Sequence, residues 1–252
     1  MSHNPPSEDR LYRDPNLAQF YDLENEWAAD LDTCAGLAAG ARAVLDLGCG
    51  TGLLAAALAE DRDVVGVDPA AAMLDIARRR PGGDRVTWVQ SGAQDVRLGR
   101  RFDLVVLTGH AFQVFLTDED QGAVLATIAA HLAPEGRFIF DTRNPAAEAW
   151  RAWTPERSRR RLDHPAFGPV DAWTDADHDS ATGVVAYRTH YEIIESGRSL
   201  TASSQIRFTA REPLAALLGQ AGLVVDRWLG DWTGDAFDPA SREIIPLGRL
   251  RP

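Results

Sequence analysis

The residue types that could carry acid–base chemistry follow two apolar runs in the middle of the chain. His110 comes after Phe102–Leu107, and Asp141 closes the run Arg137–Asp141. Histidine titrates near neutral pH, so His110 is our candidate general base and Asp141 a second one. The plainer alternatives are a hydrogen bond from His110 to backbone or to a ligand's ribose, and a purely architectural loop after Asp141. Arg143 is our candidate for binding an acidic group of a substrate, through its planar guanidinium.

A glycine-rich loop lies between the first predicted strand and the first predicted helix. The segment Val44–Gly52 reads VLDLGCGTG, and the Ala/Leu-rich stretch Leu53–Glu60 follows it. Glycine lets the backbone approach a ligand where a Cβ would clash, and the following helix directs its positive end at that ligand. The segment therefore predicts a ligand-binding loop.

The same loop distinguishes between two classes of ligand. The dinucleotide pattern Gly-x-Gly-x-x-Gly requires a glycine where this chain has Leu53. Asp46 lies at the end of the strand, two residues before Gly48. A carboxylate there suits a cationic ligand and would repel a pyrophosphate. An NAD-dependent oxidoreductase is therefore a disfavoured alternative.

Asp68 closes the second predicted strand, 16 residues beyond Gly52. An acidic residue at this place can accept hydrogen bonds from both hydroxyls of a ribose. Because Pro69 follows, the alternative is that Asp68 caps the next helix. The two roles are compatible, and we expect the ribose role.

The nine-residue loop resembles motif I of class I S-adenosylmethionine (SAM)-dependent methyltransferases, in which the acid of the strand helps to hold the methionine ammonium through water. The resemblance covers most of residues 44–141 and 210–249. It implies an α/β fold with a doubly wound, mainly parallel seven-stranded sheet whose last strand is antiparallel. It also implies SAM as the cofactor, with a loop contact from Asp46, Gly48, Cys49, Gly50 and Gly52.

Further cofactor contacts follow from this resemblance. It assigns Tyr21 to the cofactor carboxylate and Met73 to the adenine face, the alternatives being an aromatic side chain in a surface helix and plain core packing. Family members commonly carry an acid after the third strand that accepts from the adenine amino group, whereas this chain has Gly92 there. We therefore expect adenine recognition from the backbone of Ala93 and from Gln94.

The reaction is expected beyond the fourth and fifth strands, because ligands of open α/β sheets lie at the carboxyl ends of the strands. Thr108 to Gln113 should then face the sulfonium. We expect Thr108 to contact the cofactor, and His110, Gln113 and Arg143 to contact the methyl acceptor.

Composition excludes several classes of partner. The net charge of −11 disfavours nucleic acid and anionic membranes as partners. No stretch approaches the roughly 18 to 20 apolar residues that cross a bilayer, and the first ten residues are polar, so we expect a soluble, cytoplasmic protein. The two cysteines and six scattered histidines show no metal-ligand spacing, and we expect no metal.

Five alternations of strand and helix occupy the first part of the chain and predict the parallel core. We expect a single domain with a cap helix over 10–32, a core of 33–143 and 209–252, and a β-rich antiparallel insertion at 144–208. Within the insertion, 175–183 reads as a turn between strands. The insertion resembles the lid of sugar N-methyltransferases, and we expect it to cover the substrate; the alternative is a homodimer interface.

The sequence as a whole predicts a SAM-dependent methyltransferase that acts on an O or N atom of a small molecule. The alternative from another class is a non-catalytic SAM-binding regulatory protein that has kept the loop.

Overall fold

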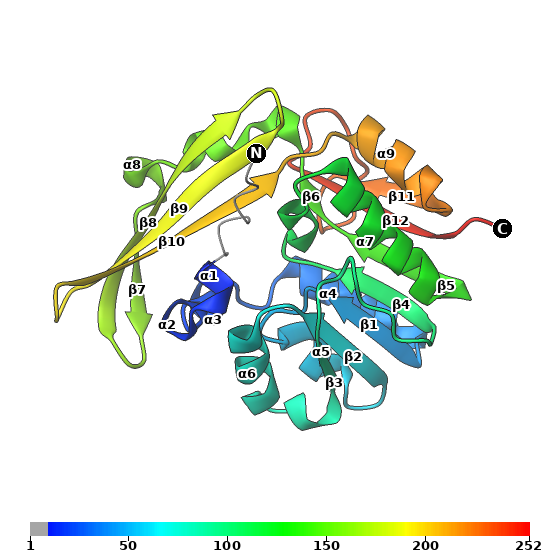
Figure 1. Ribbon diagram of the computed structural model, residues 1–252, viewed down its shortest axis with the longest axis horizontal. Coiled ribbons are helices and arrows are strands. Elements are labelled where there is room, and N and C mark those ends of the chain that lie inside the picture. Colours follow the sequence, from blue (N-terminus) through cyan, green and yellow to red (C-terminus); the bar gives the residue numbers. More distant parts are fainter. Residues whose placement is uncertain (1–9) are drawn as a thin grey trace, which may run out of the picture.

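The computed structural model describes residues 10–252, which form two sheets (Figure 1). Seven strands of the core sheet follow the order β11-β12-β5-β4-β1-β2-β3, and the short β6 adds to β12 beyond the end of β5. This order confirms the doubly wound, mainly parallel α/β fold. The strands that run in one direction are β1 (Ala43–Leu47), β2 (Asp63–Asp68), β3 (Thr87–Gln90), β4 (Phe102–Leu107), β5 (Leu132–Phe140), the short β6 (Thr142–Arg143) and β11 (Leu223–Leu229). The last strand, β12 (Glu243–Leu250), is antiparallel to its neighbours β5, β6 and β11, as expected.

Helices cover both faces of the core sheet. Successive residues of a strand point to opposite faces, so neighbouring residues pack against different helices. Val44 packs with α4 and α5, whereas its neighbour Leu45 packs with α7 and α9. Burial on both faces explains why the strands read as unbroken apolar runs. The helices of the core are α4 (Ala29–Leu37), α5 (Leu53–Leu58), α6 (Ala71–Arg79), α7 (Asp118–His131) and α9 (Arg211–Gln220), with 3₁₀ turns η1 (Ala38–Gly40), η2 (Gly83–Arg85) and η3 (Ala111–Val114).

The N-terminal segment is a chain of short helices and not the single cap helix expected over 10–32. The three helices are α1 (Arg10–Arg13), α2 (Pro15–Ala18) and α3 (Tyr21–Glu24). The first break has a local cause: a side-chain oxygen of Asp14 accepts the Asn16 backbone N–H at 2.9 Å, and Pro15 has no N–H to continue the preceding helix. We call residues 10–24 the cap.

A four-stranded antiparallel sheet follows the core strands β5 and β6. Its order is β10-β9-β8-β7. The strands are β7 (Arg160–His164), β8 (Gly168–Asp179), β9 (Val184–Ile193) and β10 (Arg198–Arg207), preceded by η4 (Pro145–Ala147), η5 (Ala149–Ala152) and α8 (Pro155–Ser158). Figure 1 shows this sheet extending away from the core, with α1–α3 between it and α6.

The turn between β8 and β9 is shorter than expected. The segment 175–183 reads as a turn, yet β8 continues to Asp179. The cause is a cross-strand pair, in which Asp175 lies opposite Arg188 and bonds to its guanidinium. The turn itself starts at Asp179, whose carboxylate accepts from the Ala181 backbone and the Thr182 hydroxyl.

One face of the second sheet is packed in two places. Val170 and Ala172 of β8 pack with Leu17 and Phe20 of the cap. Farther along, Val185, Ile206 and Phe208 pack with Trp150 and Trp153. The opposite face is largely polar. Within residues 10–252, no helix is long and apolar enough to cross a membrane.

Candidate active site

The loop between β1 and α5 adopts a backbone that needs glycine. Gly48, Gly50 and Gly52 all have positive φ angles, of 67°, 53° and 74°. The N–H groups of Gly48 and Cys49 both donate to the carbonyl of Val67, at 2.8 and 3.0 Å. These bonds fix the loop to the end of β2, so that the residues following β1 and β2 lie together at the carboxyl edge of the sheet.

The three glycines serve different purposes. A Cβ on Gly52 would lie 2.4 Å from the Trp88 ring, and one on Gly48 would lie 2.9 Å from the Cβ of Ala111. At both places glycine allows the protein to pack against itself. A Cβ on Gly50 would meet only the Tyr21 ring, at 3.7 Å. Gly50 is therefore the glycine of this loop at which the protein's own atoms leave room for a side chain.

Two carboxylates lie buried beside this loop. Asp68 accepts from the backbone N–H of Gly50 at 2.9 Å through one oxygen and from that of Ala70 at 2.8 Å through the other. The N-cap of the next helix is Ala70, so Asp68 does not cap that helix as the alternative had it. Asp68 still has free lone pairs for the expected ribose role. Asp46 is 3% exposed. Burial, together with the charge of Asp68, raises the pKa of Asp46 to about 8.

These carboxylates fit a cationic ligand. Burial also raises the pKa of Asp68, while two backbone N–H groups and the charge of Arg13 oppose the rise. For Asp46 only burial and the repulsion from Asp68 act, and both disfavour its charged form. A cation that enters this site would stabilise both charges, whereas a pyrophosphate would add to the repulsion.

The cap lies over the loop. Asp22 accepts a hydrogen bond from the Thr51 hydroxyl at 2.6 Å and forms an ion pair with Arg80. Arg80 in turn donates to the Thr51 carbonyl at 3.0 Å. The neighbouring Tyr21 ring therefore lies next to Gly50, as its expected contact with the cofactor requires. Burial, followed by nearby carboxylates led by Asp68, raises the pKa of Tyr21, which keeps the phenol neutral.

The expected adenine contacts lie after β3 and on α6. The side-chain amide of Gln94 lies against Gly92, where a Cβ would come within 2.7 Å of its oxygen. The Gln94 amide thus occupies the space that a side chain at position 92 would enter. Ala93 is buried, and Met73 is 1% exposed and packs with Ala18 of the cap.

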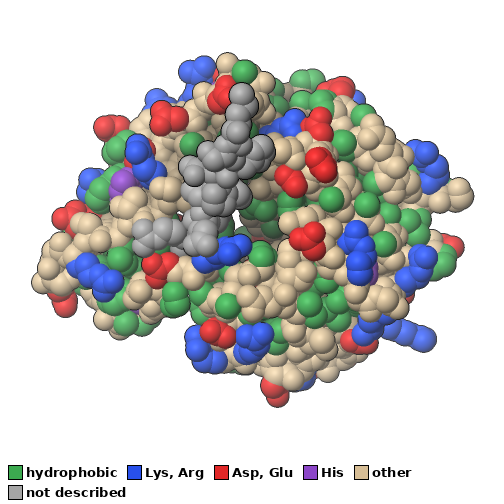
Figure 2. Space-filling view, viewed as in Figure 1, with side chains coloured by type: hydrophobic (Ala, Val, Ile, Leu, Met, Phe, Trp, Pro, Cys, Tyr) green, Lys and Arg blue, Asp and Glu red, His purple; other side chains and the backbone are tan. Residues whose placement is uncertain are grey.

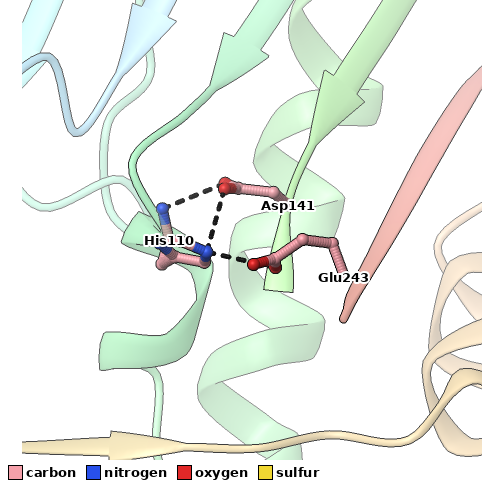
Figure 3. Close-up of side chains that lie close together, drawn as sticks. All are labelled: His110, Asp141 and Glu243. Atoms are coloured by element: carbon pink, nitrogen blue, oxygen red, sulfur yellow. Dashed lines mark hydrogen bonds and ion pairs between the residues drawn. The ribbon is translucent and has the colours of Figure 1, made fainter. Parts of the chain in front are cut away.

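The two candidate bases meet in one cluster (Figure 3). His110 Nε2 lies 3.4 Å from Asp141 Oδ2, and the His110 backbone N–H donates to Asp141 Oδ1 at 3.0 Å. The backbone of His110 is left-handed, with φ of +60°, which is costly for a residue with a Cβ. Asp141 therefore holds both the backbone and the ring of His110. Burial raises the pKa of Asp141, and the charge of His110 opposes that rise.

A third member of the cluster was not predicted. Glu243 Oε2 lies 3.1 Å from His110 Nε2, the ring nitrogen that Asp141 also approaches (Figure 3). Glu243 is the first residue of β12 and pairs with Arg143 of β6. In the sequence it is 133 residues from His110 and resembles an ordinary charged strand end. The expected topology could have indicated Glu243, because a last strand that runs antiparallel to β5 begins at the carboxyl edge of the sheet.

Two of the residues that were expected to contact the acceptor, Arg143 and Gln113, are bonded to each other. Arg143 donates to the Gln113 side-chain oxygen at 2.8 Å, and its guanidinium lies 5.3 Å from the Trp153 ring centre. Gln113 is fully buried and also donates to the Arg207 carbonyl at 3.2 Å. Gln113 therefore positions Arg143, and its own expected contact with the acceptor stays a prediction. Thr108 is half-buried, and its carbonyl accepts from the Ala111 N–H at 3.3 Å.

The fold and the site together define a Rossmann-like protein for a cationic nucleoside cofactor. A sequence family described as a methyltransferase domain matches residues 44–136. The dTDP-3-amino-3,6-dideoxy-alpha-D-glucopyranose N,N-dimethyltransferase of Streptomyces fradiae is 30% identical over 203 residues, which cover 77% of this chain and 74% of that protein. The cypemycin N-terminal methyltransferase of a Streptomyces species is 29% identical over 207 residues, 81% of each chain.

Among solved structures, the SAM-bound amino pentose methyltransferase of calicheamicin biosynthesis from Micromonospora echinaspora has the same fold. Its TM-score is 0.67 at 21% identity, over 99% of this chain and all of that one. The chain belongs to the class I SAM-dependent methyltransferases. It is an enzyme that uses SAM, and neither the NAD-dependent alternative nor the non-catalytic one is favoured.

Proposed function

We propose that this methyltransferase acts on the amine nitrogen of a small molecule. The observation that carries the proposal is the cluster of His110, Asp141 and Glu243 at the carboxyl edge of the core sheet. Two carboxylates attract a protonated amine, and an imidazole can take its proton near neutral pH. An alcohol has no charge to attract, and an imidazole removes its proton far less readily. The relative from Streptomyces fradiae is named an N,N-dimethyltransferase, and the cypemycin relative is named an N-terminal methyltransferase; the first name supports the same choice directly.

For the cofactor, we propose that each contact follows the chemistry of the side chain. Bound SAM supplies an activated methyl carbon. Asp46 meets the ammonium of its methionine part, Asp68 the ribose, and Tyr21 the carboxylate. The loop residues Gly48, Cys49, Gly50 and Gly52 lie beneath the methionine part and the ribose, Met73, Ala93 and Gln94 surround the adenine, and Thr108 lies near the sulfonium. Cys49 contributes through its backbone, because its sulfur lies against Gly66 of β2.

For the acceptor, we propose two anchors and a cover. His110 and its carboxylates receive the amine, and Arg143 binds an anionic group of the same molecule. The fixed position of Arg143 against Gln113 and Trp153 supports this role, because a guanidinium already held in place loses little freedom on binding. The insertion (144–208) excludes water from the reacting atoms.

The test compares pairs of acceptors that differ only in the reacting atom. One pair is a dTDP-linked 3-amino sugar with its 3-hydroxy counterpart, and another is a peptide with a free or an acetylated N-terminus. Mass spectrometry should detect a methylated product only from the amine of a pair. Methylation of the hydroxyl counterpart at a comparable rate would contradict the proposal.

A further inference from the structure

Glu243 lies against Nε2 of His110 in a position that is fixed by its strand. It is the first residue of β12, and its backbone is fixed on both sides. Its N–H donates to the Gly230 carbonyl at 3.2 Å, and the preceding Arg242 carbonyl accepts from Asn144 N–H at 2.8 Å. The side chain is 20% exposed and is directed at His110 Nε2. A rigid strand end thus presents a carboxylate to the imidazole.

The hydrogen bond to Glu243 decides which nitrogen of His110 can act. Nε2 has a carboxylate oxygen of Glu243 at 3.1 Å and one of Asp141 at 3.4 Å. A carboxylate only accepts, so a neutral ring in this place carries its hydrogen on Nε2. Among residues 10–252, Nδ1 has no hydrogen-bond partner, and the side chain is 24% exposed. The lone pair of the imidazole is therefore on Nδ1, which an acceptor can reach.

We propose that Glu243 is a positioning residue that holds His110 in the Nε2–H form, so that Nδ1 serves as the base for the amine. The proton of the acceptor ammonium passes to Nδ1, the freed nitrogen pair forms the new N–C bond, and the C–S bond of the cofactor breaks with its electrons on sulfur. The imidazolium keeps Nε2–H on Glu243, and it loses the Nδ1 proton to solvent after the reaction.

The groups that face the imidazole set its response to pH. They are Asp141 at the end of β5, Glu243 on β12 and, through Asp141, Arg143 on β6. Both carboxylates stabilise the imidazolium, and Asp141 also fixes the backbone of His110. Removing the charge of Glu243 alone should therefore leave the backbone in place and destabilise only the charged ring. Glu243→Gln makes this change with almost no change in size.

The experiment follows the His110 ring by ¹⁵N NMR in the protein bound to S-adenosylhomocysteine, with His110→Asn to assign its signal. We expect the Nε2–H form in the wild type. In Glu243→Gln the Nε2–H form should lose its dominance, because an amide can donate to Nε2 as well as accept from it. Asp226→Asn, which removes an exposed carboxylate that pairs with Arg249 on the same sheet, is the control and should leave the Nε2–H form dominant. This readout needs no acceptor, so it stands apart from the proposed amine specificity on which the proton step rests.

Kinetics supply the second arm. Glu243→Gln should lower kcat by about tenfold to a hundredfold while KM for SAM changes less than about threefold, and Glu243→Asp should recover part of the loss. An unchanged ratio of the two ring tautomers in Glu243→Gln would overturn the proposal. So would loss of activity with a chelator and its recovery with Mg²⁺, Mn²⁺ or Zn²⁺, because the three side chains place their ligand atoms within 4.8 Å of one another and would then be metal ligands.

Discussion

At the scale of single residues, the site contains two pairs of carboxylates with different surroundings. Asp46 and Asp68 lie beside the cofactor loop, while Asp141 and Glu243 both approach Nε2 of His110. The first pair is buried and would be stabilised by a bound cation. The second pair lies beside a cation whenever His110 is protonated. The chemistry of binding and that of proton transfer can therefore be altered separately.

His110 should matter for turnover and not for cofactor binding. His110→Asn keeps a side chain of similar shape but cannot act as a base, so kcat should fall on the order of 10²-fold or more. Calorimetry should show SAM affinity within about threefold of wild type, because the ring does not lie in the cofactor loop. A variant that turns over at the wild-type rate at every pH would return His110 to a structural role.

Asp46 should make SAM binding release protons. Its pKa of about 8 means that it is largely protonated at pH 7 in the cofactor-free protein. An ammonium nearby favours the carboxylate and lowers that pKa, so the complex holds fewer protons. Affinity should therefore rise as pH rises from 6 to 8.

Calorimetry in two buffers of different ionisation enthalpy measures this proton count at pH 7. Asp46→Asn should bind more weakly and should remove the proton release. A count near zero in the wild type would show that Asp46 is already charged without cofactor.

At the scale of elements, the loop after β1 combines packing and binding in adjacent glycines. Gly52→Ala should lower the stability of the fold, because its Cβ would collide with Trp88 in a backbone that also disfavours any side chain. Gly50→Ala carries the backbone cost alone and should chiefly weaken SAM binding. Thermal unfolding and calorimetry on the two variants should separate these effects. Equal losses of melting temperature would contradict the distinction.

The cap should control how fast cofactor leaves. Asp22 is bonded to Thr51 and Arg80, so Asp22→Asn weakens the contact between α3 and the loop without removing Tyr21. Stopped-flow displacement should show faster SAM dissociation, by about threefold to tenfold for the loss of a charge-assisted bond. Asp75→Asn, which breaks an exposed pair with Arg78 on α6, is the matched control. Equal dissociation rates in both variants would exclude the cap from this role.

Local patterns predicted the core well, because β1, β2 and β4 are almost entirely buried and each loop glycine serves a local need. The contacts made across long distances were not predictable in this way. Glu243 reaches His110 only because β12 pairs with β5 and β6. The strand Arg160–His164 has no apolar alternation to mark it, and only its pairing with β8 makes it a strand. The first break in the cap comes from Asp14 and Pro15. The expectation of one helix over 10–32 did not take these two local signals into account.

At the scale of the whole molecule, the cap bonds to both of the other parts. It reaches the cofactor loop through Asp22, and it reaches the second sheet through Phe20 and Glu24. Phe20 is fully buried and stacks on Tyr191, with ring centres 4.1 Å apart, and Glu24 pairs with Arg160. Figure 2 shows acidic and basic side chains interspersed over one face of the molecule. The connection among the three parts thus combines a buried aromatic contact with local ion pairs.

Cofactor binding should therefore order the second sheet through the cap. In the wild type, SAM should slow hydrogen exchange of the backbone amides of β8 to β10, although no cofactor contact is proposed there. Phe20→Ala removes the ring that joins the cap to Tyr191, at a cost of about 3 to 5 kcal/mol for a buried aromatic side chain. In that variant, SAM should still protect the loop after β1 but not β8 to β10.

Trp27→Ala is the control for this experiment, because Trp27 follows the cap and is 41% exposed. It should leave the SAM-dependent protection of β8 to β10 intact. Two results would contradict the coupling. One is exchange in the second sheet that ignores SAM in the wild type, and the other is protection that persists in Phe20→Ala. Either would mean that the cofactor loop and the insertion are ordered independently, so that SAM binding does not order the insertion.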